Sequence, residues 1–337
     1  MTERPKILVT QRVPDPAYPS LQAIGEVEAN MEEGLIWPYE ELLRRGPGHE
    51  YIYCLLTDNI DARFLEACAA ALPRTKMIAN MAVGFNNIDL NAATRLGIAV
   101  SNTPGVLSDT TADLAFALLM ATARRIPEAE RFLRAGKYTG WGPLLFCGAD
   151  VHHSTLGLIG AGRIGKIVAK RASGFEMRVL YYGVRRLSLA EEAEYHLDYV
   201  PLDELLQQAD FISIHVPYMP STHHLISERE FNLMKPSAIL INTARGPIVD
   251  EKALVRALQS GRIAGAGLDV FENEPAVEPE LLSMENVVLL PHIASASLQT
   301  RTLMAAMASD NLVAHFYGKR PPNILNPEVL ENPGYRP

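Results

Sequence analysis

Short apolar runs alternate with helical hydrophobic patterns along the first part of the chain. The run at residues 6–10 is apolar and β-branched, which predicts a strand, and similar runs follow it. Helices are predicted at residues 60–71 and at residues 89–96, where Asp89 can cap the start. Strands that alternate with helices indicate a parallel sheet covered on both faces. The four strands predicted here lie at residues 6–10, 51–56, 76–81 and 98–101.

The same alternation returns over a longer stretch, from Thr155 to about Pro291. Predicted helices separate most of the strands, at residues 164–173, 202–208, 227–234 and 250–260. This order is typical of a doubly wound sheet with six strands. The predicted strands lie at residues 155–159, 178–182, 211–215, 238–242, 264–269 and 287–290.

A glycine-rich turn joins the first strand and the first helix of this central stretch. In the sequence TLGLIGAGRI, Gly160 allows a tight turn and Gly162 lets the backbone approach a pyrophosphate, while the following Gly165 lets helix and strand pack closely. The helix N-terminus then offers unpaired N–H groups to phosphates. A bare GxGxxG is often only a structural turn, but the second strand at residues 178–182 completes a βαβ unit, so the pattern favours dinucleotide binding.

Breaks in the pattern suggest how the domains are connected. Thr103-Pro104-Gly105 is the first candidate boundary, and a long helix follows at residues 110–125, is interrupted at Pro127 and resumes to about Gly136. The helix at residues 297–317 is too long for a further crossover, so we expect it to return to the first domain. The predicted fold is α/β, with two Rossmann-like domains built on parallel sheets. A dinucleotide-binding domain (residues 102–297, including a dimerisation helix) is inserted into a discontinuous substrate domain (residues 1–101 plus 298–337), and the default active site is the cleft between them.

Composition narrows the classes of function. The chain has 337 residues, enough for two domains, and its net charge of -8 argues against a nucleic-acid partner. No apolar signal region opens the sequence, and the most apolar helix, at residues 114–123, is too short to cross a membrane. The three cysteines form no CxxC pair, and neither HExxH nor Cys/His spacing supports a metal site. The adjacent pairs His152-His153 and His223-His224 cannot point the same way on a strand. These features predict a reduced, cytoplasmic protein without a bound metal or a membrane partner.

Three polar residues follow strands of the central unit. Arg245, Glu274 and His292 each come after a predicted strand, where loops beyond the strand ends line the ligand crevice of an open parallel sheet. Arginine can hold a carboxylate by two parallel hydrogen bonds, histidine can transfer a proton near neutral pH, and a carboxylate can keep the histidine charged. Hydride transfer to a 2-oxo acid needs these three functions. Each residue taken alone also fits an ordinary structural role.

The end of the second central strand bears on the choice of cofactor. An acidic residue there would bind the ribose 2′-OH of NAD, but the strand is followed by Gly183, Val184, Arg185 and Arg186. Two guanidinium groups favour a 2′-phosphate, so we expect a preference for NADP(H) with NAD(H) still possible. Solvated loop arginines are the alternative.

With these features the chain resembles the D-2-hydroxyacid dehydrogenase family, and most of all its branch of glyoxylate/hydroxypyruvate reductases. The resemblance covers nearly the whole chain. It is carried by MAVGFNNID (81–89), SNTPGVLSDTTADLAFALLMATARR (101–125), GLIGAGRIG (157–165), NTARGPIVD (242–250), GAGLDVFENEP (265–275) and LLPHIASAS (289–297).

The resemblance implies a role for each matched residue. Arg245 would hold the substrate's carboxylate and carbonyl oxygen, His292 would protonate that oxygen, and Glu274 would pair with His292. The backbone N–H groups of Val83 and Gly84 would complete the carboxylate cradle. Trp141 would reach the neighbouring subunit's site in a homodimer built on residues 110–136. The cofactor-binding residues implied are Gly160, Gly162, Arg163, Ile164, Gly165, Gly183, Arg185, Arg186, Val216, Pro217, Thr222, Thr243, Ala244, Arg245, Asp269 (for the nicotinamide carboxamide) and His292.

Departures from related families limit the substrate. Val83 stands where phosphite dehydrogenases have a lysine, and formate dehydrogenases lack the Arg–Glu–His set. Ala294 replaces a glycine found in many members, so we expect a small shift in that loop. The expected activity is NAD(P)H-dependent reduction of glyoxylate or hydroxypyruvate, or of another 2-oxo acid such as 2-ketogluconate. The alternative is a cofactor-sensing interaction protein like the corepressors related to this family.

Overall fold

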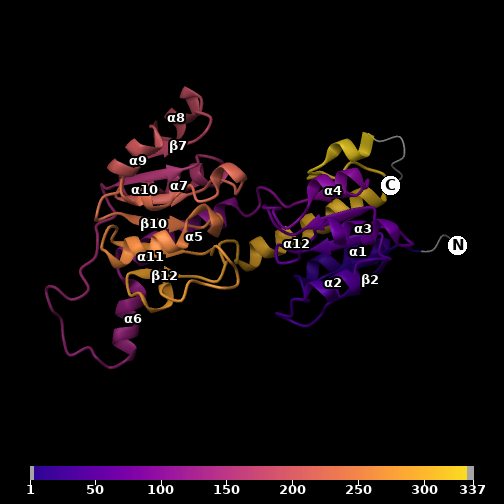
Figure 1. Ribbon diagram of the computed structural model, residues 1–337, viewed down its shortest axis with the longest axis horizontal. Helices are drawn as coiled ribbons and strands as arrows, with labels where there is room; N and C mark the ends of the chain where they lie inside the picture. The colour runs from indigo at the N-terminus through magenta and orange to yellow at the C-terminus, as the bar shows by residue number, and fades with distance from the viewer. Residues whose placement is uncertain (1–3, 332–337) are drawn as a thin grey trace. The chain divides into compact units, whose positions relative to one another are not determined.

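The computed structural model describes residues 4–331, which form two compact units (Figure 1). One unit contains the residues up to Leu107 and those from Ser297 onward, and the other is Ser108–Ala296. The first connection therefore lies later than the expected boundary after residue 101, because residues 102–107 stay with the first unit. There Asn102 N–H donates to Asn323 O (3.2 Å) and Thr103 N–H donates to Ala82 O (2.9 Å).

The first unit is built on a five-stranded parallel sheet of order β2-β1-β3-β4-β5. Its inner strands are short apolar runs buried on both faces, as expected where helices cover a parallel sheet. The edge strand β2 was not predicted, since its EVEA sequence is half-exposed and lacks an apolar run. The strands are β1 (Lys6–Val9), β2 (Glu26–Ala29), β3 (Tyr51–Cys54), β4 (Met77–Asn80) and β5 (Ala99–Ser101).

The long C-terminal helix α12 (Leu298–Phe316) packs inside this first unit. Tyr53 Oη donates to Ala305 O (3.3 Å) from β3, and Ser309 Oγ donates to Ala17 O (3.0 Å). Ala305 and Ser309 are fully buried, so α12 is a core helix of the unit. The other helices here are α1 (Tyr18–Ile24), α2 (Tyr39–Arg45), α3 (Ala62–Ala70) and α4 (Leu90–Arg95), of which α1 and α2 were not predicted.

The second unit is built on a parallel sheet with seven strands, one more than predicted, in the order β12-β11-β10-β9-β6-β7-β8. The extra strand β8 contains three residues at the sheet edge, of which one is buried, so it has no apolar run to mark it. The chain reverses its direction of winding between β6 and β9, which is where open α/β sheets bind their ligands. The strands are β6 (Thr155–Ile159), β7 (Arg178–Tyr182), β8 (Leu197–Tyr199), β9 (Phe211–Ile214), β10 (Ile239–Asn242), β11 (Gly265–Leu268) and β12 (Val287–Leu289).

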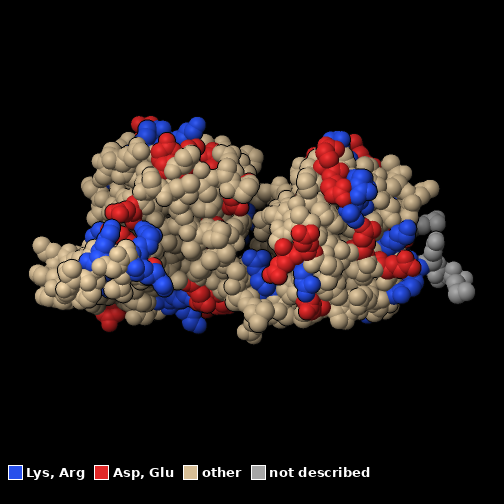
Figure 2. Space-filling model, turned by 90° about the horizontal axis from the view of Figure 1, so that it is seen from below, with Lys and Arg blue, Asp and Glu red and all other residues tan. Residues whose placement is uncertain are grey.

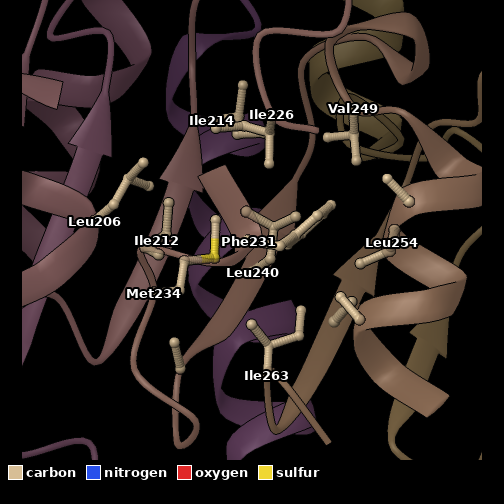
Figure 3. Close-up of a cluster of buried hydrophobic side chains, with 14 of the residues drawn as sticks. Leu206, Ile212, Ile214, Ile226, Phe231, Met234, Leu240, Val249, Leu254 and Ile263 are labelled. Atoms are coloured by element: carbon tan, nitrogen blue, oxygen red, sulfur yellow. The ribbon is translucent and has the colours of Figure 1, made fainter. Parts of the chain in front are cut away.

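Helices cover both faces of this second sheet. On one face, side chains from β9 and β10, including Ile212 and Leu240, point toward Phe231 and Leu254 on the covering helices (Figure 3). On the other face, α5 and α7 pack on β6, β10 and β11. The expectation of two α/β domains with parallel sheets is thus confirmed. The helices of this unit are α5 (Ser108–Ala123), α6 (Ile126–Arg134), α7 (Arg163–Ser173), α8 (Leu189–Tyr195), α9 (Leu202–Gln208), α10 (Glu228–Phe231) and α11 (Glu251–Gln259).

The helix break that was predicted at Pro127 lies just before that residue. The break is at Arg125, whose φ of 53° is left-handed, and Pro127 lies in the first turn of α6, where its missing N–H costs nothing. α5 is apolar because it is buried in its own unit, with Leu118 and Leu119 each 1% exposed. Its apolar character is therefore explained by packing within its own unit and gives no support to the homodimer expected on residues 110–136.

α6 and residues 135–150 form an arm that extends from the second unit (Figure 1). No residue of α6 is buried. The arm exposes large apolar side chains, and in Figure 2 its outermost part is drawn almost entirely as uncharged residues. Over the described residues, no helix is both long and apolar enough to span a membrane.

Candidate active site

The glycine-rich turn between β6 and α7 has the geometry of a phosphate-binding loop. Gly160 has φ +100°, and a Cβ there would lie 2.9 Å from the carbonyl carbon and oxygen of His215. A Cβ at Gly165 would overlap the carbonyl oxygen of Gly160, so helix and strand pack too closely for a side chain. By contrast, apart from its chain neighbours, no described residue has an atom within 4 Å of a Cβ placed at Gly162, which caps α7. The loop thus leaves open the approach to the helix N-terminus, and these residues fit a dinucleotide pyrophosphate.

In the loop after β7, the two predicted phosphate-binding arginines, Arg185 and Arg186, have different surroundings. Arg186 makes a bidentate pair with Glu192 (Nε–Oε1 2.7 Å, Nη2–Oε2 2.8 Å), and Tyr181 Oη donates to the same carboxylate (2.7 Å). These hydrogen bonds from Arg186 and Tyr181 lower the pKa of Glu192 to about 2. Arg185 is exposed and makes no ion pair with any described residue. The residues that follow β7 do not predict this pairing, because Glu192 belongs to α8 and only the fold brings it to Arg186.

Further predicted cofactor-binding residues follow the carboxyl ends of two neighbouring strands. Val216 and Pro217 follow β9, while Thr243 and Ala244 follow the adjacent β10. The buried hydroxyl of Thr243 has no hydrogen-bond partner among the described residues, which suits a site that takes a ligand. The hydroxyl of Thr222, in contrast, donates to Pro217 O (2.8 Å) and shapes its own turn. Its role as a cofactor ligand stays a prediction.

Arg245 is held by the turn that follows β10. Asn242 Nδ2 donates to Arg245 O (3.0 Å), and Asn242 Oδ1 accepts from Ala244 N–H (3.0 Å). The guanidinium is partly buried and donates to Ala244 O (2.6 Å). Burial lowers the pKa of Arg245, and the nearby charge of Glu274 opposes that shift. Asn242 supports the turn through both of these hydrogen bonds, a role that was not predicted.

His292 and Glu274 are brought together across two loops. His292 Nδ1 lies 2.9 Å from Glu274 Oε2, and Glu274 Oε1 accepts from Phe271 N–H (3.0 Å). Although burial acts to raise the pKa of Glu274, the hydrogen bond and charge of His292, the bond from Phe271 and the charge of Arg245 outweigh it and lower the pKa. An ionised carboxylate only accepts, so Nδ1 donates in this hydrogen bond, and Nε2 is the ring nitrogen that the bond leaves available.

Asp269 holds the loop that contains His292. Its side chain is fully buried, with Oδ1 accepting from Ile293 N–H (2.7 Å) and Oδ2 accepting from Ala294 N–H (2.8 Å). Burial raises the pKa of Asp269, and the two backbone hydrogen bonds limit that rise. His292 itself has a left-handed φ of 54°, which needs support from its neighbours. Binding of the nicotinamide carboxamide by Asp269 stays a prediction, while its hold on this loop was not foreseen.

The other predicted substrate residues lie outside this group. Val83 and Gly84 belong to the first unit, where Asn102 Nδ2 donates to Val83 O (2.8 Å) and Asn80 Nδ2 donates to Gly84 O (3.0 Å). The N–H groups of Val83 and Gly84 donate to no acceptor among the described residues, as an anion cradle requires. Trp141 lies on the arm and is 83% exposed. No cluster of His, Cys, Asp or Glu suited to a metal occurs in the described part of the chain.

Comparison with known proteins gives a consistent picture. Residues 116–294 match the model of the D-isomer specific 2-hydroxyacid dehydrogenase, NAD binding domain. The chain is 47% identical to the glyoxylate reductase of Korarchaeum cryptofilum, over 99% of this chain and 100% of that one. The glyoxylate reductase structure from Paecilomyes thermophila is 32% identical, with a TM-score of 0.85 over 97% of this chain and 100% of that one. An NADPH-dependent glyoxylate/hydroxypyruvate reductase of Sinorhizobium meliloti, solved with NADP and malonate, is 34% identical, with a TM-score of 0.82 over 96% and 97% of the two chains.

Proposed function

Because the chain belongs to the D-isomer-specific 2-hydroxyacid dehydrogenase family, we propose that it reduces small 2-oxo acids, glyoxylate and hydroxypyruvate among them, to D-2-hydroxy acids with a reduced nicotinamide dinucleotide. The observation that carries this proposal is the His292–Glu274 pair at 2.9 Å, with the charge of Arg245 acting on the same carboxylate. In this proposal His292 is the acid, Glu274 orients it and Arg245 is the anion anchor.

Each of the three residues has a distinct task in the proposed reaction. The bound cofactor supplies the hydride that reduces the carbonyl carbon. Arg245 holds the substrate's carboxylate through its planar set of donors. His292 donates the Nε2 proton to the carbonyl oxygen, and Glu274 accepts from Nδ1 and stabilises the charged ring. Asp269 keeps the loop in place, since it binds both amides that follow His292.

The activity is tested by following NADPH and NADH oxidation with glyoxylate, hydroxypyruvate and 2-ketogluconate. We expect turnover by the wild type and a large loss in Glu274→Gln. The matched control is Glu176→Gln, because Glu176 also pairs with a histidine (His153, 3.1 Å) but both side chains are exposed. The control should behave like the wild type. No turnover with any of the three acids would refute the proposal.

For the cofactor we propose a preference for NADPH that rests mainly on Arg185. Arg186 already donates two parallel hydrogen bonds to Glu192, whereas Arg185 forms no ion pair with a described residue and is available to a phosphate. Loss of a charge-assisted phosphate contact should raise KM for NADPH roughly tenfold or more in the double variant Arg185→Ala with Arg186→Ala. KM for NADH should change little. Equal or better kcat/KM with NADH in the unmutated protein would contradict the preference.

We also propose that the protein is a homodimer that uses the arm as a contact. The arm exposes Leu133 (60%), Trp141 (83%) and Leu144 (85%), and clustered apolar exposure of this kind is typical of an interaction surface. Light scattering at micromolar concentration should give the mass of a dimer, and Trp141→Ser with Leu144→Ser should shift it toward the monomer. A monomer mass for the wild type would rule the dimer out.

A further inference from the structure

A second histidine–glutamate pair contains Glu272, which lies two residues before Glu274 in the chain. His224 Nε2 is 2.7 Å from Glu272 Oε1, and both side chains are partly buried, at 34% and 22% exposure. His224 has a left-handed φ of 49°, and its ring stacks on that of His223 with centroids 4.0 Å apart. Although the sequence offered no reason to give this His-His pair a role, one of its members is held in a defined geometry.

The segment that contains Glu272 also contains Glu274, and it is bound at several points. Glu272 N–H donates to Glu251 Oε1 (2.6 Å), and Glu251 N–H donates to Glu272 Oε2 (3.1 Å), which ties the segment to the start of α11. At its other end, Phe271 N–H donates to Glu274 Oε1 (3.0 Å). The rotamer of Glu274 therefore depends on the course of the backbone from Phe271 onward.

The same segment lies directly against the turn that follows Arg245. A Cβ at Gly246 would overlap the carbonyl group of Phe271, so the two backbones touch. His224 contacts both sides of this junction. Its backbone N–H donates to Pro247 O (2.9 Å), and its ring binds Glu272. One residue thus links the turn that carries Arg245 with the segment that carries Glu274.

We propose that His224, through its hydrogen bond with Glu272, is a positioning residue that fixes the distance between the anion anchor Arg245 and the carboxylate Glu274, and through Glu274 the orientation of His292. This inference rests on the reduction proposed above. Its physical basis is that a misplacement of about 1 Å in a reacting group can lower a rate by about 10²-fold, even when the mutated residue does not touch the substrate.

The test compares His224→Asn with His153→Asn. Asparagine tolerates a left-handed φ, so the change removes the ring without new backbone strain, and its side chain is shorter than the imidazole that bonds Glu272. His153 is a matched control, because it too has a left-handed φ (59°) and pairs with a glutamate, Glu176, but at an exposed position. The first measurement is hydrogen exchange of the amides at residues 271–274, which needs no activity. We expect faster exchange there in His224→Asn and wild-type exchange in His153→Asn.

The second measurement is kinetic. We expect His224→Asn to lower kcat for 2-oxo acid reduction by roughly 5- to 100-fold. The Kd for NADPH should be unchanged, because the glycine loop is not touched. In a Glu274→Gln background the same substitution should lower kcat little further, since both changes act through one carboxylate.

The outcomes separate this inference from the proposed function. Unchanged exchange at residues 271–274, an unchanged kcat, or an equal fall in kcat with and without Glu274→Gln would each overturn the role of His224. A comparable fall in NADPH affinity would overturn it too, because the effect would then be a general loss of structure. If the wild type reduces no 2-oxo acid, the proposed function fails, and the exchange measurement still decides whether His224 positions the segment.

Discussion

The substitution Asp269→Asn tests directly whether the side chain of Asp269 holds the loop that contains His292. The carboxylate is fully buried, and each of its oxygens accepts one backbone N–H, from Ile293 at 2.7 Å and from Ala294 at 2.8 Å. Asparagine has nearly the same shape but only one acceptor oxygen. Its NH₂ group would face the second backbone N–H, so that one buried donor loses its partner.

The expected cost follows from these two bonds. An unsatisfied buried group costs about 1–3 kcal/mol, and the remaining bond weakens because its acceptor is no longer charged, which together give about 2–4 kcal/mol. Burial raises the pKa of Asp269, so the wild type spends some free energy to keep the group ionised, and the substitution recovers that part. We therefore expect the free energy of unfolding to fall by about 1–3 kcal/mol.

Chemical denaturation of both proteins measures this loss, with Asp210→Asn as the control. Asp210 also accepts from a backbone amide, Thr155 N–H (2.9 Å), and from Lys235 Nζ (2.7 Å), but its side chain is 33% exposed. Water can replace a lost partner there, so the control should lose less than about 1 kcal/mol. Asp269→Asn should also speed hydrogen exchange at Ile293 and Ala294. Equal destabilisation by the two variants, with unchanged exchange, would refute a loop-holding role for Asp269.

Three further outcomes test the site. His292→Ala should lower the rate of reduction by about 10²–10⁴, the usual contribution of positioned proton transfer, with little change in NADPH binding, and near-normal turnover would remove His292 from the mechanism. Arg245→Lys should restore little of the kcat/KM lost in Arg245→Ala, because lysine lacks the planar pair of donors, and wild-type kinetics would show that bidentate binding is not needed. The pKa of Glu274 is lowered in the fold, so its contribution to stability is complete above the ordinary carboxyl pKa of about 4.5 and is lost as the pH falls through the folded value. Denaturation should then give the wild type a larger free energy of unfolding than Glu274→Gln near neutral pH, and this difference should shrink in acid. A difference that is constant with pH would contradict the lowered pKa of Glu274.

Much of the fold could be predicted because hydrophobic periodicity is a local signal. The strands buried on both faces, such as β6 and β10, are short apolar runs that can be recognised without any partner. The same argument explains what was missed. β2 and β8 lie at sheet edges with few buried residues, so only pairing with a neighbour makes them strands. The apolar stretch of α5 could be recognised, but the element it packs against could not.

The chemistry of the candidate site divides in the same way. The sequence by itself determined the residue types and their positions after strands: the glycines of the β6–α7 turn, Arg245, Glu274 and His292. Only the tertiary structure decided which groups meet. It pairs Arg186 with Glu192, binds Asp269 to the backbone beyond His292, and joins His224 to Glu272 over a long stretch of chain. The physical reason is that a strand or a tight turn depends on residues close in sequence, while an ion pair or a buried carboxylate depends on loops that the sheet brings together from distant parts of the chain.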